Sequence, residues 1–430
     1  MVRLVGICTT VFVALLSVAT AVAQPFPIRA GLGTPGFSGD GGPATKAKLS
    51  VPSGVFLDID GNIVIADTSN DRLRVVGADG TIRTISGTGD RETTGDGGPA
   101  IDASLNSPTA VFVDGGGNIY VAEWTGHRIR KISPSGTITT VLGTGSHGYN
   151  GDGKQGTETN IWSPSAIFID GDRNLYVAEW DNHRIRKMTA DGVVSTIAGT
   201  GFFGTAADGT VATKARIHHP NGIFVTEDGS VYFSEMGSQL VRRIKPDGTL
   251  ETIAGTGSPD DDGDGGPGTQ ADVNNPAGLF LDTAGNLYIA DSGNGSIRRV
   301  TPGGTIDTVI GGNLFGNDDS DDPTELSLHR PNDLFVTTDG GILVAEGSGH
   351  QVRFFPLLAE PTELAGSLPK TSDFDGDAVV GFTDFLLFVD QFGLSSDDPG
   401  FDARFDLFED GTVGFADFLR FARAFGSSGQ

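Results

Sequence analysis

Short apolar segments separated by turn-forming residues run through most of the chain. Between residues 108 and 142, four such segments of five or six residues follow one another, at 110–114, 118–122, 128–132 and 137–142. Gly, Asn or Pro occupies the gaps between them. Short segments with this spacing favour strands joined by tight turns. The pattern therefore predicts a four-stranded antiparallel sheet within this stretch.

The same pattern recurs six times at a nearly constant interval. A proline marks each unit, at Pro52, Pro108, Pro164, Pro220, Pro276 and Pro331, spaced 56 or 55 residues apart. In every unit a Phe lies 4 residues after this proline, a carboxylate 15 after, an Arg 22 after and an Asp 12 before. Radial repetition of four-stranded sheets builds a β-propeller. The predicted fold class is therefore mainly β, a six-bladed propeller.

The wording of the repeat resembles a known family. The run Asn118–Glu123, followed by His127–Lys131, resembles the NHL repeat, and the run Gly95–Ala100 is typical of its long bacterial version. The resemblance covers residues 25–355 and implies a six-bladed propeller. The sixth unit lacks a clear outer strand, whereas Pro27–Gly33 is similar to the end of an outer strand. We therefore predict that Phe26–Ala30 crosses over to complete the sixth blade.

The first 23 residues have the features of a secretory signal. Arg3 precedes an apolar stretch, and Ala21–Ala23 provides a small-residue cleavage site. A membrane anchor is the weaker interpretation, because the stretch is short and contains two Thr. The only Cys, Cys8, lies in this segment, so we expect a secreted, extracellular protein without disulfides. The expected domains are the propeller at 24–355, a linker at 356–370 and a tail module at 371–430.

The charge balance limits the class of partner. The chain has 29 basic and 55 acidic residues, a net charge of −26. Nucleic acids and anionic membranes attract basic surfaces, so neither is an expected partner. The tail module contributes 3 Arg against 12 acidic residues, a net charge of −9. Its acidic groups are arranged in a pattern that points to a metal.

The tail contains two loops with oxygen ligands at calcium spacing. Calcium takes six to eight oxygen ligands, and a twelve-residue loop supplies them from positions 1, 3, 5, 7 and 12. The candidate ligands are Asp373, Asp375, Asp377, Val379 and Asp384 in the first loop, and Asp406, Asp410, Thr412 and Asp417 in the second. Phe408 at position 3 costs the second loop one ligand. A helix is expected after each loop, over 384–392 and 417–425.

The two loop–helix halves resemble a dockerin type I module, a relative of the EF-hand. This resemblance implies calcium binding and docking onto a cohesin domain of a scaffold or cell-surface protein. Two features depart from the family pattern. Ala378 replaces the usual Gly at position 6, and aromatic residues, Phe382 and Phe415, occupy the region that carries partner recognition. The partner is therefore expected to be a cohesin-like or other surface or scaffold protein.

On the propeller, most repeated polar residues are expected to be structural. The carboxylate 15 residues after each proline lies across a turn from the Arg at 22, so an ion pair within each blade explains both columns. The Asp 12 residues before each proline lies in a Gly-rich loop, where hydrogen bonding to turn backbone is the first interpretation. Calcium binding by these loops is the second.

Ligand-binding residues are expected where the repeat breaks its symmetry. All three Trp and most His lie at the turn between strands two and three or just before strand one, which emerge on the same face of a propeller. The candidates are Trp124, Trp162, Trp180, His183, His218, His219, Tyr149 and Phe202. We expect them to form an aromatic and imidazole patch off the propeller axis. Exposed aromatic clusters mark binding sites, and the alternative is that the Trp rings pack as local cores.

The sequence favours binding over catalysis. It lacks a Gly-x-Ser-x-Gly elbow, a His-Glu-x-x-His motif and a Cys nucleophile outside the signal. The preferred hypothesis is a secreted propeller that binds a protein or glycan ligand and is anchored through a calcium-dependent module. The alternative is a secreted propeller enzyme, a lyase or a lactone- or sugar-directed hydrolase, with a metal in the central channel.

Overall fold

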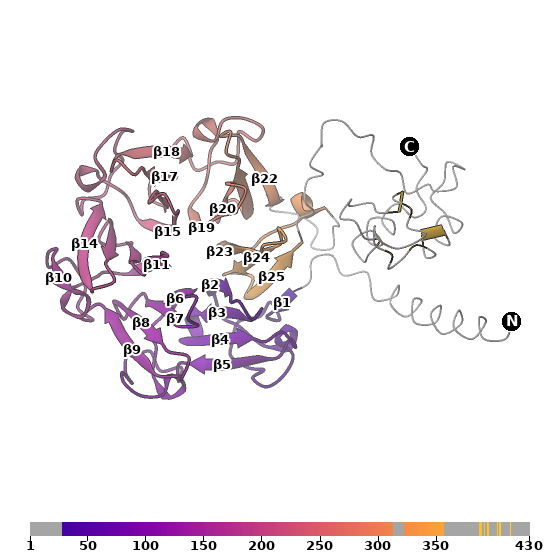
Figure 1. Ribbon diagram of the computed structural model, residues 1–430, viewed down its shortest axis with the longest axis horizontal. Coiled ribbons are helices and arrows are strands. Elements are labelled where there is room, and N and C mark those ends of the chain that lie inside the picture. Colours follow the sequence, from indigo (N-terminus) through magenta and orange to yellow (C-terminus); the bar gives the residue numbers. More distant parts are fainter. Residues whose placement is uncertain are drawn as a thin grey trace. The chain divides into compact units, whose positions relative to one another are not determined.

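The computed structural model describes residues 28–312 and 322–356, together with isolated positions between 387 and 413. The described residues between 28 and 356 form six antiparallel sheets around a central axis (Figure 1). The chain divides into two compact units, Met1–Ala359 and Glu360–Gln430. The six-bladed propeller expected from the repeat is thereby confirmed.

The first five blades follow the repeat in chain order. Blade one contains β2 (Pro52–Leu57), β3 (Ile63–Asp67), β4 (Arg72–Val76) and β5 (Ile82–Ser86), and blade two contains β6 (Pro108–Val113), β7 (Ile119–Glu123), β8 (Arg128–Ile132) and β9 (Ile138–Leu142). Blade three contains β11 (Pro164–Ile169), β12 (Leu175–Glu179), β13 (Arg184–Met188) and β14 (Val193–Ala198), and blade four contains β15 (Pro220–Val225), β16 (Val231–Glu235), β17 (Leu240–Ile244) and β18 (Leu250–Ala254). Blade five contains β19 (Pro276–Leu281), β20 (Leu287–Asp291), β21 (Ser296–Val300) and β22 (Ile306–Gly311). The short strand β10 (Lys154–Gln155) adds to the edge of blade three.

The sixth blade is closed by the beginning of the described chain. It contains β23 (Pro331–Val336), β24 (Ile342–Glu346) and β25 (Gln351–Phe355), and β1 (Ile28–Ala30) pairs antiparallel with β25. The predicted crossover is therefore confirmed for Ile28–Ala30, while Phe26 and Pro27 lie outside the described residues. Ala30 is fully buried in a core cluster with Ala345 and Val352, so the closure is apolar as well as hydrogen-bonded.

Hydrophobic cores lie between neighbouring blades. One such cluster combines Val64 and Leu73 of blade one with Val121 and Ile132 of blade two. Seven one-turn 3-10 helices lie in the described connections: η1 (Ala44–Lys46), η2 (Thr68–Asn70), η3 (Ala100–Asp102), η4 (Gly156–Glu158), η5 (Ala212–Lys214), η6 (Gly268–Gln270) and η7 (Pro323–Glu325). None of the helices among the described residues is long and apolar enough to cross a bilayer.

The innermost strands surround the axis with a ring of aromatic side chains. The six Phe that follow each repeat proline contact one another around the ring, with neighbouring centroids 4.9–5.4 Å apart. They are Phe56, Phe112, Phe168, Phe224, Phe280 and Phe335. Tilted and edge-to-face rings at this separation attract one another beyond their buried area. The ring therefore joins all six blades at the axis.

The predicted signal segment and most of the tail lie outside the described residues. Residues 1–27 lie outside the described part of the chain, as do 357–386. The nine candidate calcium ligands, from Asp373 to Asp417, also lie outside the described residues. Within the tail, Leu387 and Phe388 are helical, and Phe388 is buried.

Candidate functional site

The repeated carboxylates and arginines form one buried network per blade. In all six blades the carboxylate at the end of the second strand lies 3.3–3.5 Å from the Arg of the third strand. In blades one to five, whose loop Asp is among the described residues, the Arg also pairs at 2.6–3.2 Å with the Asp of the Gly-rich loop. The intra-blade pair is confirmed. The loop Asp is now explained as the second partner of the same Arg.

Each buried carboxylate also holds the segment that leads into the first strand. It accepts the backbone N–H of the residue two positions before the repeat proline, at 2.6–3.3 Å. Burial raises the pKa of Glu123, Glu179 and Glu235 to about 7, although the nearby Arg acts in the opposite direction. These groups are committed to the fold and are unavailable for chemistry on a ligand.

Histidines at the turn after the second strand join neighbouring blades. The Nδ1 atoms of His127, His183 and His350 accept backbone N–H groups of Ser163, His219 and Val51, respectively, at 3.1–3.2 Å. Asp71 and Gln239 make the same contact in blades one and four. The imidazoles are therefore structural acceptors in the neutral form, and this includes His183, which the sequence suggested as a ligand-binding residue.

A row of aromatic and imidazole rings crosses blades two to four. The ring centroids of Trp124 and Trp180 lie 5.5 Å apart. Trp180 stacks on His219, with ring centroids 4.6 Å apart and an interplanar angle of 8°. His219 contacts His183 and His218, and His218 contacts Phe203. We call these six residues the aromatic row. Phe203, which is 66% exposed, forms its outer end.

The remaining candidate residues lie apart from the aromatic row. Trp162 contacts His147, which in turn contacts His127. The ring centroid of Tyr149 lies 4.0 Å from the guanidinium carbon of Arg184, and that of Phe37 lies 3.8 Å from the guanidinium carbon of Arg72 in blade one. The same contact in two blades explains the position of Tyr149 as part of the blade structure. Phe202 is 68% exposed, and its ring centroid lies 6.0 Å from the guanidinium carbon of Arg216.

The expectation of an off-axis patch is wrong for the two central Trp. Trp124 and Trp180 line a pocket of about 420 Å³ at the axis, together with Met236, His350 and Arg330. We call this pocket the outer chamber. Each Trp directly follows a buried carboxylate that ends the second strand, and each begins the turn that leads to the third strand. The carboxylate points into the blade and the next side chain faces the axis.

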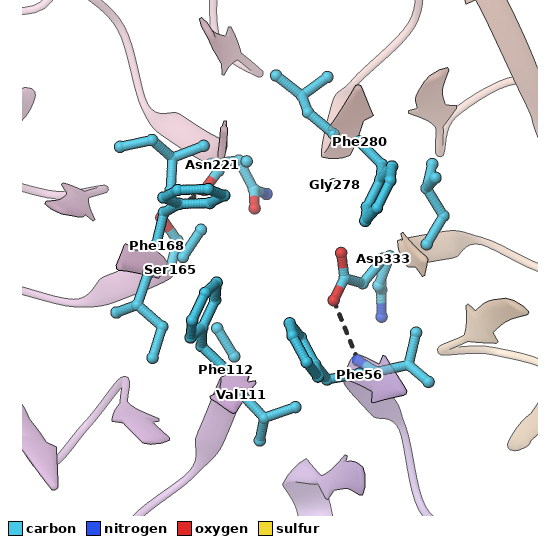
Figure 2. Close-up of a pocket in the computed structure, with 18 of the residues that line it drawn as sticks. Phe56, Val111, Phe112, Ser165, Phe168, Asn221, Gly278, Phe280 and Asp333 are labelled. Carbon is cyan, nitrogen blue, oxygen red and sulfur yellow. Dashed lines mark hydrogen bonds between the residues drawn. The ribbon is translucent and has the colours of Figure 1, made fainter. Parts of the chain in front are cut away.

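A smaller chamber of about 80 Å³ continues along the axis and is lined by the innermost strands (Figure 2). The two chambers share a polar collar formed by the residues that follow the repeat prolines: Ser53, Thr109, Ser165, Asn221 and Asn332. The six Phe of the axial ring and Asp333 line the inner chamber. Comparison of the first and second residues after each proline would have revealed both the collar and Asp333.

The metal expected by the enzyme hypothesis has few ligands in this channel. Among the described residues that line the two chambers, the ionisable ones are Asp333, His350 and Arg330. Within the described part of the chain, three acidic side chains lie close enough together to share a metal ion: Asp260, Asp262 and Asp272. That group lies in the connection between blades four and five, which is exposed at Asp260 and Asp262.

Comparisons with known proteins agree with the repeat. Residues 86–151 match the teneurin NHL domain. Human teneurin-1 is 31% identical over 249 residues, which cover 50% of this chain and 9% of teneurin-1. Bovine NHL repeat-containing protein 2 is 28% identical over 351 residues, which cover 72% of this chain and 47% of that protein. The chain thus matches less than half of the length of either relative.

Solved structures share the fold. A protein of unknown function from Bacteroides thetaiotaomicron superposes with a TM-score of 0.57 and 19% identity, over 77% of this chain and 75% of that one. An auxiliary nutrient binding protein from Bacteroides ovatus gives a TM-score of 0.54 and 13% identity, over the same shares of the two chains. The repeats and the fold together define the described residues between 28 and 356 as an NHL-repeat six-bladed β-propeller.

The imidazole contacts lead to an expectation for pH dependence. Burial, followed by the neighbouring His219 and His218, lowers the pKa of His183 from 6.5 to about 4. The unfolded chain therefore takes up this proton first as the pH falls from 6.5 to 4, so the histidine contributes acid sensitivity in that window. In an NMR titration, the His183 imidazole should remain neutral at pH 5.5.

The control for this titration is taken from the repeat itself. His183→Gln places there the acceptor that blade four has at Gln239, so it should retain the contact with the N–H of His219 and remove the acid sensitivity. His183→Ala should lose the contact and about 1 kcal/mol of stability. An imidazole that titrates near 6.5, or a Gln variant no more stable than the Ala variant, would contradict this role.

Proposed function

We propose that this protein is an exported binding propeller whose ligand, a protein or a glycan, is held at the outer chamber and along the aromatic row. The observation that carries the proposal is an open axial pocket of about 420 Å³ with two indole rings, a thioether and two amide side chains in its lining. Pockets of this size with a few convergent polar groups are typical of ligand sites. Trp is also among the residues that dominate binding energies at interfaces.

A comparison of residue types among the six repeat units supports the same proposal. The positions that build the blades carry the same residue types in all six units, whereas the residues that line the outer chamber differ from unit to unit. The residue after the buried carboxylate, for example, is Trp124 in blade two, Met236 in blade four and Gly347 in blade six. A channel that recognises one particular ligand needs such differences around the axis, because a symmetric channel would offer the ligand the same contacts six times.

Binding is favoured over the enzyme hypothesis by the chemistry of the chambers. A metal-dependent lyase or hydrolase would need several carboxylates or imidazoles converging on one point. The described lining residues provide one carboxylate and one imidazole, and the Nδ1 atom of that imidazole is already used as an acceptor. The buried acids of the blades are similarly committed to arginines.

The attachment of the propeller is the second part of the proposal. The carboxylate spacing at 373–384 and 406–417 supports a calcium-dependent, dockerin-like module that docks onto a cohesin-like or other surface or scaffold protein. The predicted signal at residues 1–23 supports export to a compartment where calcium is abundant. Together they describe a propeller that presents a ligand site while the tail holds it on a surface or in a complex.

The ligand proposal is tested with glycan and peptide arrays probed by the mature chain. The double variant Trp124→Ala/Trp180→Ala should lose at least about tenfold in affinity for any ligand found, because stacking on both rings is removed. Its melting temperature should stay within about 5 °C of the parent, since both rings are only partly buried.

Tyr149→Ala provides the matched control, because this aromatic residue lies over blade arginines and apart from the aromatic row. It should leave ligand affinity unchanged. Loss of the fold in the Trp double variant would show that the two rings are core residues, and equal loss of affinity with Tyr149→Ala would place the site elsewhere.

The attachment proposal is tested by calcium titration of the mature chain, followed by far-UV circular dichroism. Close carboxylates repel one another without a cation, so helix content should rise on addition of calcium and fall again with a chelator. The variant Asp373→Ala/Asp375→Ala/Asp377→Ala should lose most of this gain. A helix signal that is independent of calcium in the parent chain would contradict the calcium module.

A further inference from the structure

One residue of the inner chamber breaks a column of small residues. The second position after the repeat proline is Gly54, Ala110, Ala166, Gly222 and Gly278 in blades one to five, and it is Asp333 in blade six. Five blades therefore present a hydrogen atom or a methyl group at this level, and the sixth presents a carboxylate. Asp333 lies two residues before Phe335 on β23, so both side chains are on the same face of the strand.

The fold holds this carboxylate in a defined orientation at the axis. One oxygen, Oδ2, accepts the backbone N–H of Val55 on the neighbouring innermost strand at 3.0 Å (Figure 2). The other oxygen, Oδ1, lies beside Gly278, where a Cβ atom would approach it to 2.4 Å. The absence of a side chain at Gly278 thus provides the space that Asp333 occupies next to the chamber.

The electrostatic setting of Asp333 differs from that of the six blade carboxylates. Each of those lies against an Arg, whereas no basic side chain pairs with Asp333 among the residues that the structure describes. Phe56, Phe280 and Phe335 line the same small chamber. Burial raises the pKa of Asp333 to about 7, and the two backbone N–H donors offset only part of this effect. The ionised carboxylate therefore lacks a counter-charge.

The shape of the channel limits what can reach this group. The inner chamber of about 80 Å³ has room for a narrow chain, whereas the outer chamber of about 420 Å³ can hold a larger body. The path between them passes the polar collar. Arg330, on the wall of the outer chamber, is exposed to solvent, so water and salt screen its charge more than that of a group deep in the channel.

We propose that Asp333 anchors a primary ammonium group on an unbranched alkyl chain, the lysine side chain of a peptide ligand, which enters through the outer chamber. This inference rests on the proposed function and narrows its ligand to the protein class. The ammonium would supply the missing counter-charge, and the Phe rings that line the inner chamber have faces that attract cations. If Asp333 served only to join blades six and one through Val55, a neutral amide would serve as well, because that contact needs an acceptor and no charge.

The test compares two probes by calorimetry with the mature full chain. N-acetyl-lysine methylamide should bind at least about tenfold more tightly than N-acetyl-norleucine methylamide, which has a similar chain without the charge. Asp333→Asn retains an oxygen for the N–H of Val55, so it should fold, and it should lose at least about tenfold in affinity for the lysine probe while its affinity for the norleucine probe is unchanged.

The pH dependence provides a second readout that a purely structural role would not produce. The ionisable groups that line the two chambers in the described part of the chain are Asp333, His350 and Arg330. Affinity of the parent for the lysine probe should rise between pH 6 and pH 8, and that of Asp333→Asn should be flat. His350→Gln, which places there the acceptor of Gln239, should retain the rise and so separates the two titrating groups.

The outcomes separate this inference from the function on which it rests. Equal affinity of the parent for the two probes, or unchanged affinity of Asp333→Asn for the lysine probe, would overturn the ammonium site even if the Trp variants abolish array binding. Conversely, Trp variants that retain every array ligand would reject the aromatic platform, while the probe results still decide on Asp333. If Asp333→Asn does not fold, Asp333→Ala, the residue of blades two and three, takes its place, and the pH series on the parent remains decisive.

Discussion

The propeller depends on one interaction that each blade repeats, a buried carboxylate beside a buried guanidinium. Transfer of both charges out of water is costly, and such a pair is stabilising only when its geometry and remaining hydrogen bonds are satisfied. Here the Arg has a second carboxylate in the Gly-rich loop wherever that loop Asp is described, in blades one to five. The blade carboxylate also accepts a backbone N–H from the segment before the first strand. The network therefore ties the outer loop, the third strand and the start of the innermost strand to one point.

This network positions the channel and leaves its lining free to vary. Once the carboxylate fixes the segment before the repeat proline, the residues just after that proline face the axis whatever their identity. The collar consequently carries Ser, Thr and Asn, and one blade carries Asp333. The same holds for the residue after the carboxylate, which is indole in blades two and three and smaller in blades five and six. Each blade thus places a residue with the same structural role in all six units next to a residue whose type differs from blade to blade.

The sequence was sufficient to predict the scaffold. The repeat predicted the six blades, the ion pairs and the closure at Ile28–Ala30, because each depends on local spacing or on columns of identical residues. Strand ends differ by one or two residues, as in β6, which begins at Pro108. The position of Trp124 and Trp180 at the axis was missed, because an offset in the repeat identifies a face of the propeller but not a distance from its axis. Asp333 was missed because its column of Gly and Ala carries no chemistry in the other blades.

The division between scaffold and site is most directly tested at two neighbouring residues. Glu179 belongs to the buried network and Trp180 to the outer chamber, so equilibrium unfolding should show a larger loss of stability for Glu179→Gln than for Trp180→Ala. Glu179→Gln should lose roughly 2–4 kcal/mol of the free energy of unfolding, because an amide cannot accept hydrogen bonds at both of its ends. Trp180→Ala should lose about 1 kcal/mol or less. A larger loss for the tryptophan than for the glutamate would contradict the division.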